Sequence, residues 1–253
     1  MAQAAKGLSW ALTERPNRSR ILLEAYTGQH AVALSLAGQF GGRVRQAKAA
    51  EWITPDCAPP TRIGRRLEIV HEKMPEKGRA RLPRLHIPHG LAFGSGDHAT
   101  TRMLLGDLTR RKEWGKTALL DLGTGSGILA LTARLLGARK IVAADFDAEA
   151  VRTARQNELL NFSSPLIGWR CSDVLRLRAT ARYDLVLANL YNKVLCEAAP
   201  QITSSVAPGG QLWLSGVLRT QQGEVVASYR RQRLRLIRVA YRGKWVMLQW
   251  SKP

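Results

Sequence analysis

Glycine and acidic residues recur in this chain at spacings that suit a nucleotide-like ligand. The segment DLGTGSG carries Gly123, Gly125 and Gly127 directly after Asp121. Glycine lets a backbone turn tightly and approach a ligand without a Cβ clash. The spacing is G-x-G-x-G, which differs from the G-x-G-x-x-G of dinucleotide-binding turns. A carboxylate before the turn would repel a pyrophosphate, so Asp121 favours a cationic or amino-bearing ligand.

Two further acidic residues follow the next apolar runs. Asp145 ends the run KIVAAD, and Asp173 ends the run LIGWRCSD. An acidic residue in the position of Asp145 can accept hydrogen bonds from both ribose hydroxyls of a nucleotide. Asp173 is placed to meet an adenine amino group. Ribose, adenine and a positively charged amino-acid group together describe S-adenosylmethionine, and the pattern predicts this cofactor.

A polar Asn-Leu-Tyr follows the apolar run YDLVLA, and its Asn189 and Tyr191 are the predicted catalytic residues. The oxygen of an Asn side chain can accept a hydrogen bond from a target N–H and so aim the nitrogen lone pair at a methyl group. The end of this strand faces the methyl-donor site in this architecture. Tyr191 is expected to form a wall that excludes water. Asn is common at strand ends for purely structural reasons, but the apolar run before it favours a functional role.

These residues need alternating strands and helices to bring them together. Apolar runs at 118–122, 140–145, 166–173, 183–190 and 211–216 alternate with helical patterns. Those patterns cover 100–112, 128–136, 147–160, 192–207 and 220–232, and Pro200 is expected to interrupt the fourth. Asp97 or Thr100 is the expected N-cap of the first. The alternation predicts an α/β fold with a mostly parallel sheet, which binds ligands outside the carboxyl ends of its strands. Residues 234–241 and 244–250 predict a closing antiparallel hairpin.

The charge of the chain is strongly positive. Its 253 residues hold 39 Lys and Arg against 19 Asp and Glu, a formal net charge of +20. Eight basic side chains lie in each of the segments 62–84 and 219–244. The positive electrostatic field of such a chain favours phosphate-bearing or acidic partners, so RNA contact is one interpretation of the basic surface. A general bias toward Arg would give the same composition, and both readings stay open.

Cysteine usage and hydropathy bear on location. Cys57, Cys171 and Cys196 are odd in number and widely spaced, which is typical of reduced thiols and of neither disulfides nor a zinc site. No run of 18 apolar residues is present. We therefore expect a cytoplasmic protein with no metal and no membrane partner.

Five segments together resemble the PrmA family of ribosomal protein methyltransferases, which modify large-subunit ribosomal protein L11. They are GLAFGSGDHATT, DLGTGSGILA, AADFDAEAVRTARQNELLN, ANLYNKVL and PGGQLWLSGVL. The first is the most specific, because methyltransferases in general lack it. The resemblance implies a class I, Rossmann-like S-adenosylmethionine-dependent methyltransferase. It also implies that Thr101, Gly123, Asp145 and Asn189 contact the cofactor. The loop that ends at Thr101 would fold over the cofactor, with Phe93 and His98 shaping the lid.

The same resemblance implies a domain order and a substrate. We expect a small N-terminal α/β unit for substrate recognition at 1–50, a linker with short strands at 51–90, and the methyltransferase domain at 91–253. The implied activity is N-methylation of lysine or N-terminal amines of a ribosomal protein. The N-terminal unit is shorter than that of the family, and Leu190 and Tyr191 depart from its pattern. Another protein substrate, or a base nitrogen of RNA, therefore stays an alternative.

Overall fold

The computed structural model describes residues 9–14, 21–26, 30–41, 43–44, 60–71, 82–88, 96–178 and 181–253. The chain divides into two compact units, residues 1–54 and 55–253. In the first unit, β1 (Ser9–Glu14) pairs antiparallel with β2 (Ile21–Tyr26), and α1 (His30–Phe40) follows. These elements agree with the small α/β unit that the sequence analysis expected at the N-terminus.

The second unit is built on a seven-stranded sheet with the order β11-β12-β10-β9-β6-β7-β8. Its strands are β6 (Ala118–Leu122), β7 (Lys140–Asp145), β8 (Gly168–Cys171), β9 (Tyr183–Asn189), β10 (Val206–Leu218), β11 (Arg235–Arg242) and β12 (Trp245–Ser251). Only β12 runs antiparallel to its neighbours, β10 and β11. The predicted mostly parallel sheet with a C-terminal hairpin is confirmed.

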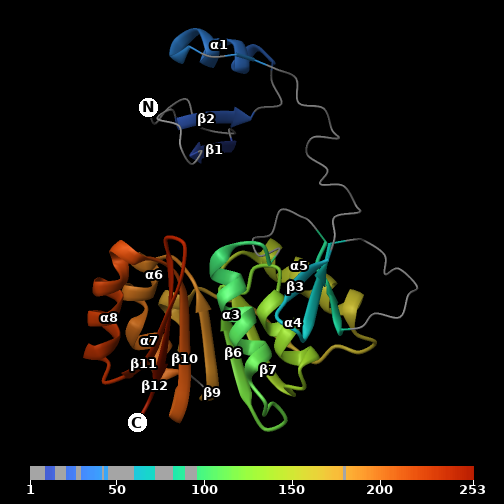
Figure 1. Ribbon diagram of the computed structural model, residues 1–253, viewed down its shortest axis with the longest axis vertical. Coiled ribbons are helices and arrows are strands. Elements are labelled where there is room, and N and C mark those ends of the chain that lie inside the picture. Colours follow the sequence, from blue (N-terminus) through green and yellow to red (C-terminus); the bar gives the residue numbers. More distant parts are fainter. Residues whose placement is uncertain are drawn as a thin grey trace. The chain divides into compact units, whose positions relative to one another are not determined.

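Helices cover both faces of this sheet (Figure 1). One face carries α3 (Ala99–Arg110), α4 (Ile128–Leu135) and α5 (Ala148–Asn161), and the other carries α6 (Asn192–Glu197), α7 (Ala199–Ser204) and α8 (Gln222–Arg231). Strand side chains alternate between two cores: Leu119 packs with α3 and α4, while Leu120 packs with α6, α7 and α8. Two-sided burial explains why these strands read as continuous apolar runs.

A second, three-stranded sheet lies within the predicted linker. It has the order β3-β4-β5 and consists of β3 (Thr61–Ile63), β4 (Leu67–Val70) and β5 (Arg84–His86). The sequence predicted β4 as an alternating strand, but all four of its side chains are buried. Glu68 can be buried because Arg62 and Arg84 donate to its two carboxylate oxygens, at 3.1 and 3.0 Å.

Candidate active site

The glycine turn joins the carboxyl end of β6 to α4. Gly123, Gly125 and Gly127 have φ angles of 71°, 54° and 82°, the left-handed region that glycine tolerates without strain. The amides of Gly123 and Thr124 both donate to the carbonyl oxygen of Ala144, at 2.9 and 3.1 Å. The turn is thereby tied to the end of β7, at the edge where open α/β sheets bind ligands.

Asp145 ends β7 beside this turn and is only 8% exposed. Its Oδ2 accepts a hydrogen bond from the amide of Gly125 at 2.9 Å, and its Oδ1 accepts one from the amide of Asp147 at 3.1 Å. Each carboxylate oxygen has further acceptor capacity, so both can still receive a ribose hydroxyl. The structure thus brings two predicted cofactor contacts, Asp145 and Gly125, within one hydrogen bond of each other.

Asp121 lies in β6 and is fully buried. Its Oδ2 accepts a hydrogen bond from the Thr124 hydroxyl at 2.6 Å, while its Oδ1 has no hydrogen-bond partner in the part of the chain that the structure describes. Burial raises the pKa of Asp121 to about 7, although the Thr124 hydroxyl and the nearby backbone amide of Ala130 oppose this. A buried acceptor without a donor costs free energy. A cationic group bound at Oδ1 would remove that cost.

Asp173 lies two residues beyond β8, the strand next to β7. It caps the short 3₁₀ helix η1 (Val174–Arg176), because its side chain accepts a hydrogen bond from the amide of Leu175 at 2.9 Å. This cap is a sufficient structural reason for an Asp here. Its contact with adenine stays a prediction.

Asn189 ends β9, and its side chain reaches the first turn of α3. Its Nδ2 donates to the hydroxyl of buried Thr101 at 3.3 Å. This bond directs the amide nitrogen toward Thr101 and leaves the carbonyl oxygen to accept from another donor. In the β6–β9 register Leu122 pairs with Ala188, so Asn189 lies alongside the glycine turn. Two predicted site residues that are 88 positions apart are therefore in contact.

The start of α3 differs from the prediction. Neither Asp97 nor Thr100 is the N-cap: that position is held by His98, without a side-chain capping bond. Asp97 instead accepts a hydrogen bond from the Thr61 hydroxyl at 3.2 Å and lies 3.7 Å from Nε2 of His71. The expected capping side chain therefore binds the three-stranded sheet.

His98, Phe93 and Tyr191 were predicted to surround the site. His98 Nδ1 lies 2.7 Å from the Thr100 hydroxyl, and its ring packs edge-on to Trp245 with centroids 4.8 Å apart. Burial, with a smaller effect of Lys244, lowers the pKa of His98. Tyr191 directly precedes α6, and its side chain is 71% exposed. Phe93 lies outside the described residues.

Two neighbours of the site escaped the sequence analysis. Phe146 directly follows Asp145, and its ring is 79% exposed although it is large and apolar. Gly216 in β10 has φ 88°, and a Cβ there would stand 2.3 Å from the carbonyl oxygen of Leu190. Gly216 thus lets β10 pack against the backbone that follows Asn189. The sequence did contain a signal for each of these two residues. Phe146 is an aromatic residue directly after an Asp that ends a strand, and Gly216 is a glycine inside an apolar strand.

The residues at this edge fit S-adenosylmethionine. Asp121 offers a buried acceptor to a cationic amino group, Asp145 offers two oxygens to a ribose, and exposed Phe146 offers an apolar surface beside them. These residues lie at one edge of a seven-stranded sheet that has a single antiparallel strand. This fold and this site define a class I S-adenosylmethionine-dependent methyltransferase.

Comparison with known proteins identifies the family. The model of the family described as "Ribosomal protein L11 methyltransferase (PrmA)" matches residues 23–253, and the chain belongs to this family. The ribosomal protein L11 methyltransferase of Azotobacter vinelandii is 40% identical over 219 residues, which cover 82% of this chain and 72% of that protein. The protein of the same name from Dechloromonas aromatica is 36% identical over 236 residues, covering 91% and 76%.

Solved structures agree with the fold. A crystal structure of ribosomal protein L11 methylase from Lactobacillus delbrueckii subsp. bulgaricus has a TM-score of 0.68 and 27% identity, and the match covers 76% of this chain and 98% of that chain. The N-methyltransferase NodS from Bradyrhizobium japonicum, in complex with S-adenosyl-l-homocysteine, has a TM-score of 0.51 at 16% identity, which supports the fold alone.

Neither a metal-binding cluster nor a membrane-spanning helix occurs among the described residues. Among them, no group of three or more His, Cys, Asp and Glu side chains is arranged to hold a metal ion. None of the helices described is long and apolar enough to cross a membrane.

Proposed function

We propose that this methyltransferase modifies amine groups of ribosomal protein L11, and that Asn189 receives the target nitrogen. One observation carries the proposal: the hydrogen bond from Asn189 to Thr101 fixes an amide acceptor at the end of β9, beside the glycine turn. The names of the relatives, which specify ribosomal protein L11, support the substrate.

Each residue of the edge has a role in this proposal. S-adenosylmethionine, when bound, supplies an electrophilic methyl group. Asp145 would hold the ribose and Asp121 the amino group, while the glycine turn gives the backbone close access. Asn189 would accept the hydrogen of the target amine and so direct the nitrogen lone pair. Tyr191 would limit the access of water.

The target amine must be neutral before it can attack. A lysine amine has a pKa of about 10.4 in water. Burial beside a cationic group disfavours its ammonium form and lowers this pKa. Positioning alone can then supply much of the rate acceleration, so we assign no general base, and none to His98. Lysine and N-terminal amines both fit this scheme.

Two further features belong to the same proposal. Residues 1–50 would contribute to recognition of the protein substrate, with residues 91–253 performing the transfer. The cytoplasm, where ribosomal proteins are made, would be the location of the enzyme.

A labelling experiment tests the substrate class. Radiolabelled S-adenosylmethionine and the enzyme are added to a matched cell extract, and the products are divided between ribonuclease and protease. We expect the label to survive ribonuclease, to be lost to protease, and to lie in a band of the size of ribosomal protein L11. Label that is lost to ribonuclease would show that RNA is the substrate and would overturn the proposal.

A matched pair of variants tests the role of Asn189. Asn189→Ala should reduce labelling roughly 100-fold, because it removes a positioning contact at the reacting nitrogen. Asn192→Ala removes an amide three residues away whose Nδ2 donates to Glu224 at 3.1 Å, and it should retain most of the activity. Equal losses in both variants would exclude a specific role for Asn189.

A further inference from the structure

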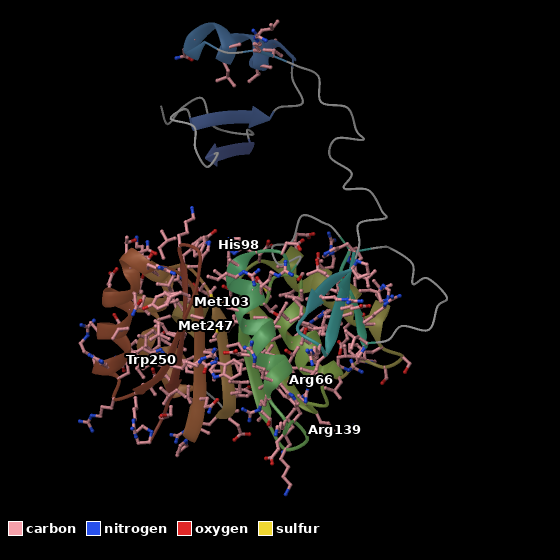
Figure 2. The ribbon with its side chains drawn as sticks, in the orientation of Figure 1. Arg66, His98, Met103, Arg139, Met247 and Trp250 are labelled. Carbon is pink, nitrogen blue, oxygen red and sulfur yellow. The ribbon has the colours of Figure 1, made fainter. Side chains whose placement is uncertain are left out.

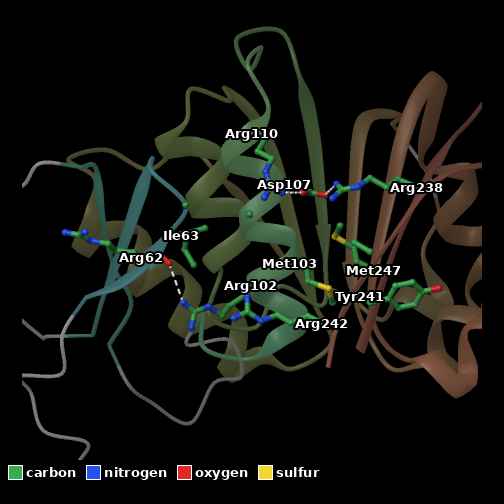
Figure 3. Close-up of a pocket in the computed structure, with 13 residues that line it drawn as sticks. Arg62, Ile63, Arg102, Met103, Asp107, Arg110, Arg238, Tyr241, Arg242 and Met247 are labelled. Carbon is green, nitrogen blue, oxygen red and sulfur yellow. Dashed lines mark hydrogen bonds and ion pairs between the residues drawn. The ribbon is translucent and has the colours of Figure 1, made fainter. Parts of the chain in front are cut away.

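An arginine-lined pocket lies apart from the residues of the methyl-transfer site. Its volume is about 340 Å³, and α3, the β3–β4 turn, β11 and β12 form its walls (Figure 3). None of the predicted cofactor or catalytic residues lines it. A cavity of this size is at the lower end of the range that holds small ligands.

Five arginines and a single acidic residue are among the residues that line this pocket, and the guanidinium of one of them, Arg62, points away from it toward Glu68. The basic residues are Arg62, Arg102, Arg110, Arg238 and Arg242, and the acidic one is Asp107. Asp107 is already engaged: Arg110 donates to its Oδ1 at 2.6 Å, and Arg238 donates to its Oδ2 (Figure 3). The carboxylate therefore has little capacity left to neutralise the other arginines.

Arg102 and Arg242 carry charge that no carboxylate of the described residues offsets. In the part of the chain that the structure describes, neither forms an ion pair, and the hydrogen bond given by Arg102 goes to the backbone oxygen of Arg62 at 3.4 Å. Arg62 itself shares Glu68 with Arg84. Two arginines that line one pocket and form no ion pair among the described residues have the hydrogen-bonding capacity to bind an anion.

The floor of the pocket is apolar. Met103 of α3 and Met247 of β12 point into it, and Ile63 of β3 completes it (Figure 3). Methionine adapts its shape to flat or irregular ligands and makes favourable contacts with aromatic rings. An apolar floor under a rim of guanidinium groups suits a ligand that joins a flat ring to a phosphate.

The pocket also explains the two basic segments of the sequence. Segment 62–84 supplies Arg62, and segment 219–244 supplies Arg238 and Arg242, so α3 brings the two clusters together from opposite sides. Arg65 and Arg66 of the exposed β3–β4 turn extend the positive surface beyond the pocket. Residues 55–253 as a whole carry 32 basic side chains against 16 acidic ones. A negatively charged ligand that extends beyond the pocket would therefore meet further cationic side chains.

We propose that this pocket binds single-stranded RNA, with phosphate groups on Arg102 and Arg242 and an unstacked base against the partly buried Met103, which packs on the buried core that includes Met247. Guanidinium forks bind phosphate through paired hydrogen bonds, and single-stranded RNA presents bases that protein surfaces can receive. An acidic peptide would satisfy the arginines, but its carboxylates would leave the apolar floor uncovered. The floor therefore favours RNA.

Binding of a short fluorescent single-stranded RNA to the full chain, followed by anisotropy, tests the proposal. The variant is Arg102→Gln with Arg242→Gln. Arg110 and Arg238 are left in place because they hold buried Asp107. The control is Arg139→Gln with Arg182→Gln, which removes the same charge from exposed positions at the amino ends of β7 and β9. Figure 2 shows Arg139 at the opposite end of the second unit from His98.

We expect the pocket variant to weaken RNA binding at least tenfold and the control to change it little. The salt dependence should also fall by about 0.7 in the log–log slope for each phosphate contact that is lost. Binding of S-adenosylhomocysteine should be unchanged, which shows that the pocket variant is folded and separates this proposal from the methyl-transfer site.

Three results would overturn the proposal. The first is no RNA binding by the wild-type chain. The second is an equal loss in the pocket and control variants, which would mean that only the general field attracts RNA. The third is selective loss of binding to a glutamate peptide of equal charge with RNA binding intact, which would make the pocket a peptide site.

Discussion

The carboxyl edge of β6 and the junction of α4, α5 and β8 each bury a carboxylate, but they surround it differently. At the junction, Glu158 is 2% exposed and accepts hydrogen bonds from the indole of Trp169 at 2.7 Å and from two backbone amides at 2.9 Å, and it pairs with Arg134. At the edge, Asp121 is more deeply buried, and its Oδ1 has no donor among the described residues.

The pKa values of the two groups move in opposite directions. Burial alone would raise the pKa of Glu158, but the hydrogen bonds and Arg134 outweigh it and lower the pKa. Burial raises the pKa of Asp121 to about 7. A carboxylate with a full set of donors holds the fold together. One that is left short of donors has an acceptor available to a ligand, and this distinguishes Asp121 from Glu158.

The largest expected effect is on stability at the junction. Glu158→Gln leaves the guanidinium of Arg134 buried without a counter-charge, and should lower the free energy of unfolding by about 3 to 5 kcal/mol. The control is Glu149→Gln, which breaks an exposed pair with Arg152 and should cost about 0.5 kcal/mol or less. Denaturant unfolding measures both. If both variants lost a similarly small amount of unfolding free energy, Glu158 would not have the structural role assigned to it.

In the cofactor-free protein, the contribution of Asp121 to stability should fall as the pH rises, because its pKa is raised. A carboxylate with a lowered pKa, such as Glu158, behaves in the opposite way. The folded pKa of Asp121, about 7, is above its unfolded value, so Asp121 stabilises the fold below about pH 4, and this stability is lost as pH rises toward 7. The expected loss is on the order of 4 kcal/mol, since the pKa is raised from 3.8 to about 7 and one pKa unit corresponds to about 1.4 kcal/mol. Asp121→Asn should abolish this part of the pH dependence, as measured by unfolding over that range. Parallel pH profiles for the two proteins would contradict it.

Asp145 should affect ligand affinity more than folding. Asp145→Asn should weaken the binding of S-adenosylhomocysteine about 10- to 100-fold, because a hydrogen bond to a charged group contributes about 1.5 to 3 kcal/mol. Calorimetric titration measures this. Asp184→Asn is the matched control, since Asp184 accepts a hydrogen bond from the amide of Ala118 at the other end of the sheet. An affinity that is equal in both variants would exclude the ribose contact.

The smallest effect is expected at Thr101. Thr101→Val removes the acceptor for Asn189 Nδ2 and lets the amide rotate. The turnover rate should fall about five- to tenfold, which is the size of one hydrogen bond of roughly 1 to 1.5 kcal/mol. Thr101→Ser should restore it. A loss of turnover in the Ser variant as large as in the Val variant would show that packing, and not the hydroxyl, matters.

Local signals in the sequence were sufficient for much of the fold. The predicted start of α5 is confirmed, because the Asp147 side chain caps it by accepting from the amide of Glu149 at 2.9 Å. The predicted interruption at Pro200 is confirmed, since α6 and α7 are separate helices. The glycine turn also lies where its spacing placed it. Each of these features depends on residues close together in the chain.

Features that depend on distant residues could not be read from the sequence. Burial of Glu68 requires Arg84, which is 16 positions away on another strand. Gly216 lies so close to the backbone of Leu190 that a Cβ atom would clash, and this contact arises only when β9 and β10 pair. The arginine pocket likewise requires α3 to bring together two basic segments that the sequence showed only as separate clusters.

The central claim is that the carboxyl edge of β6, β7 and β9 transfers methyl groups to ribosomal protein L11. Its most direct test is the intact mass of purified ribosomal protein L11 after incubation with S-adenosylmethionine and either wild type or Asn189→Ala. We predict a gain of one or more methyl groups with wild type and almost none with the variant. An unchanged mass with wild type, while S-adenosylhomocysteine binds normally, would contradict the claim.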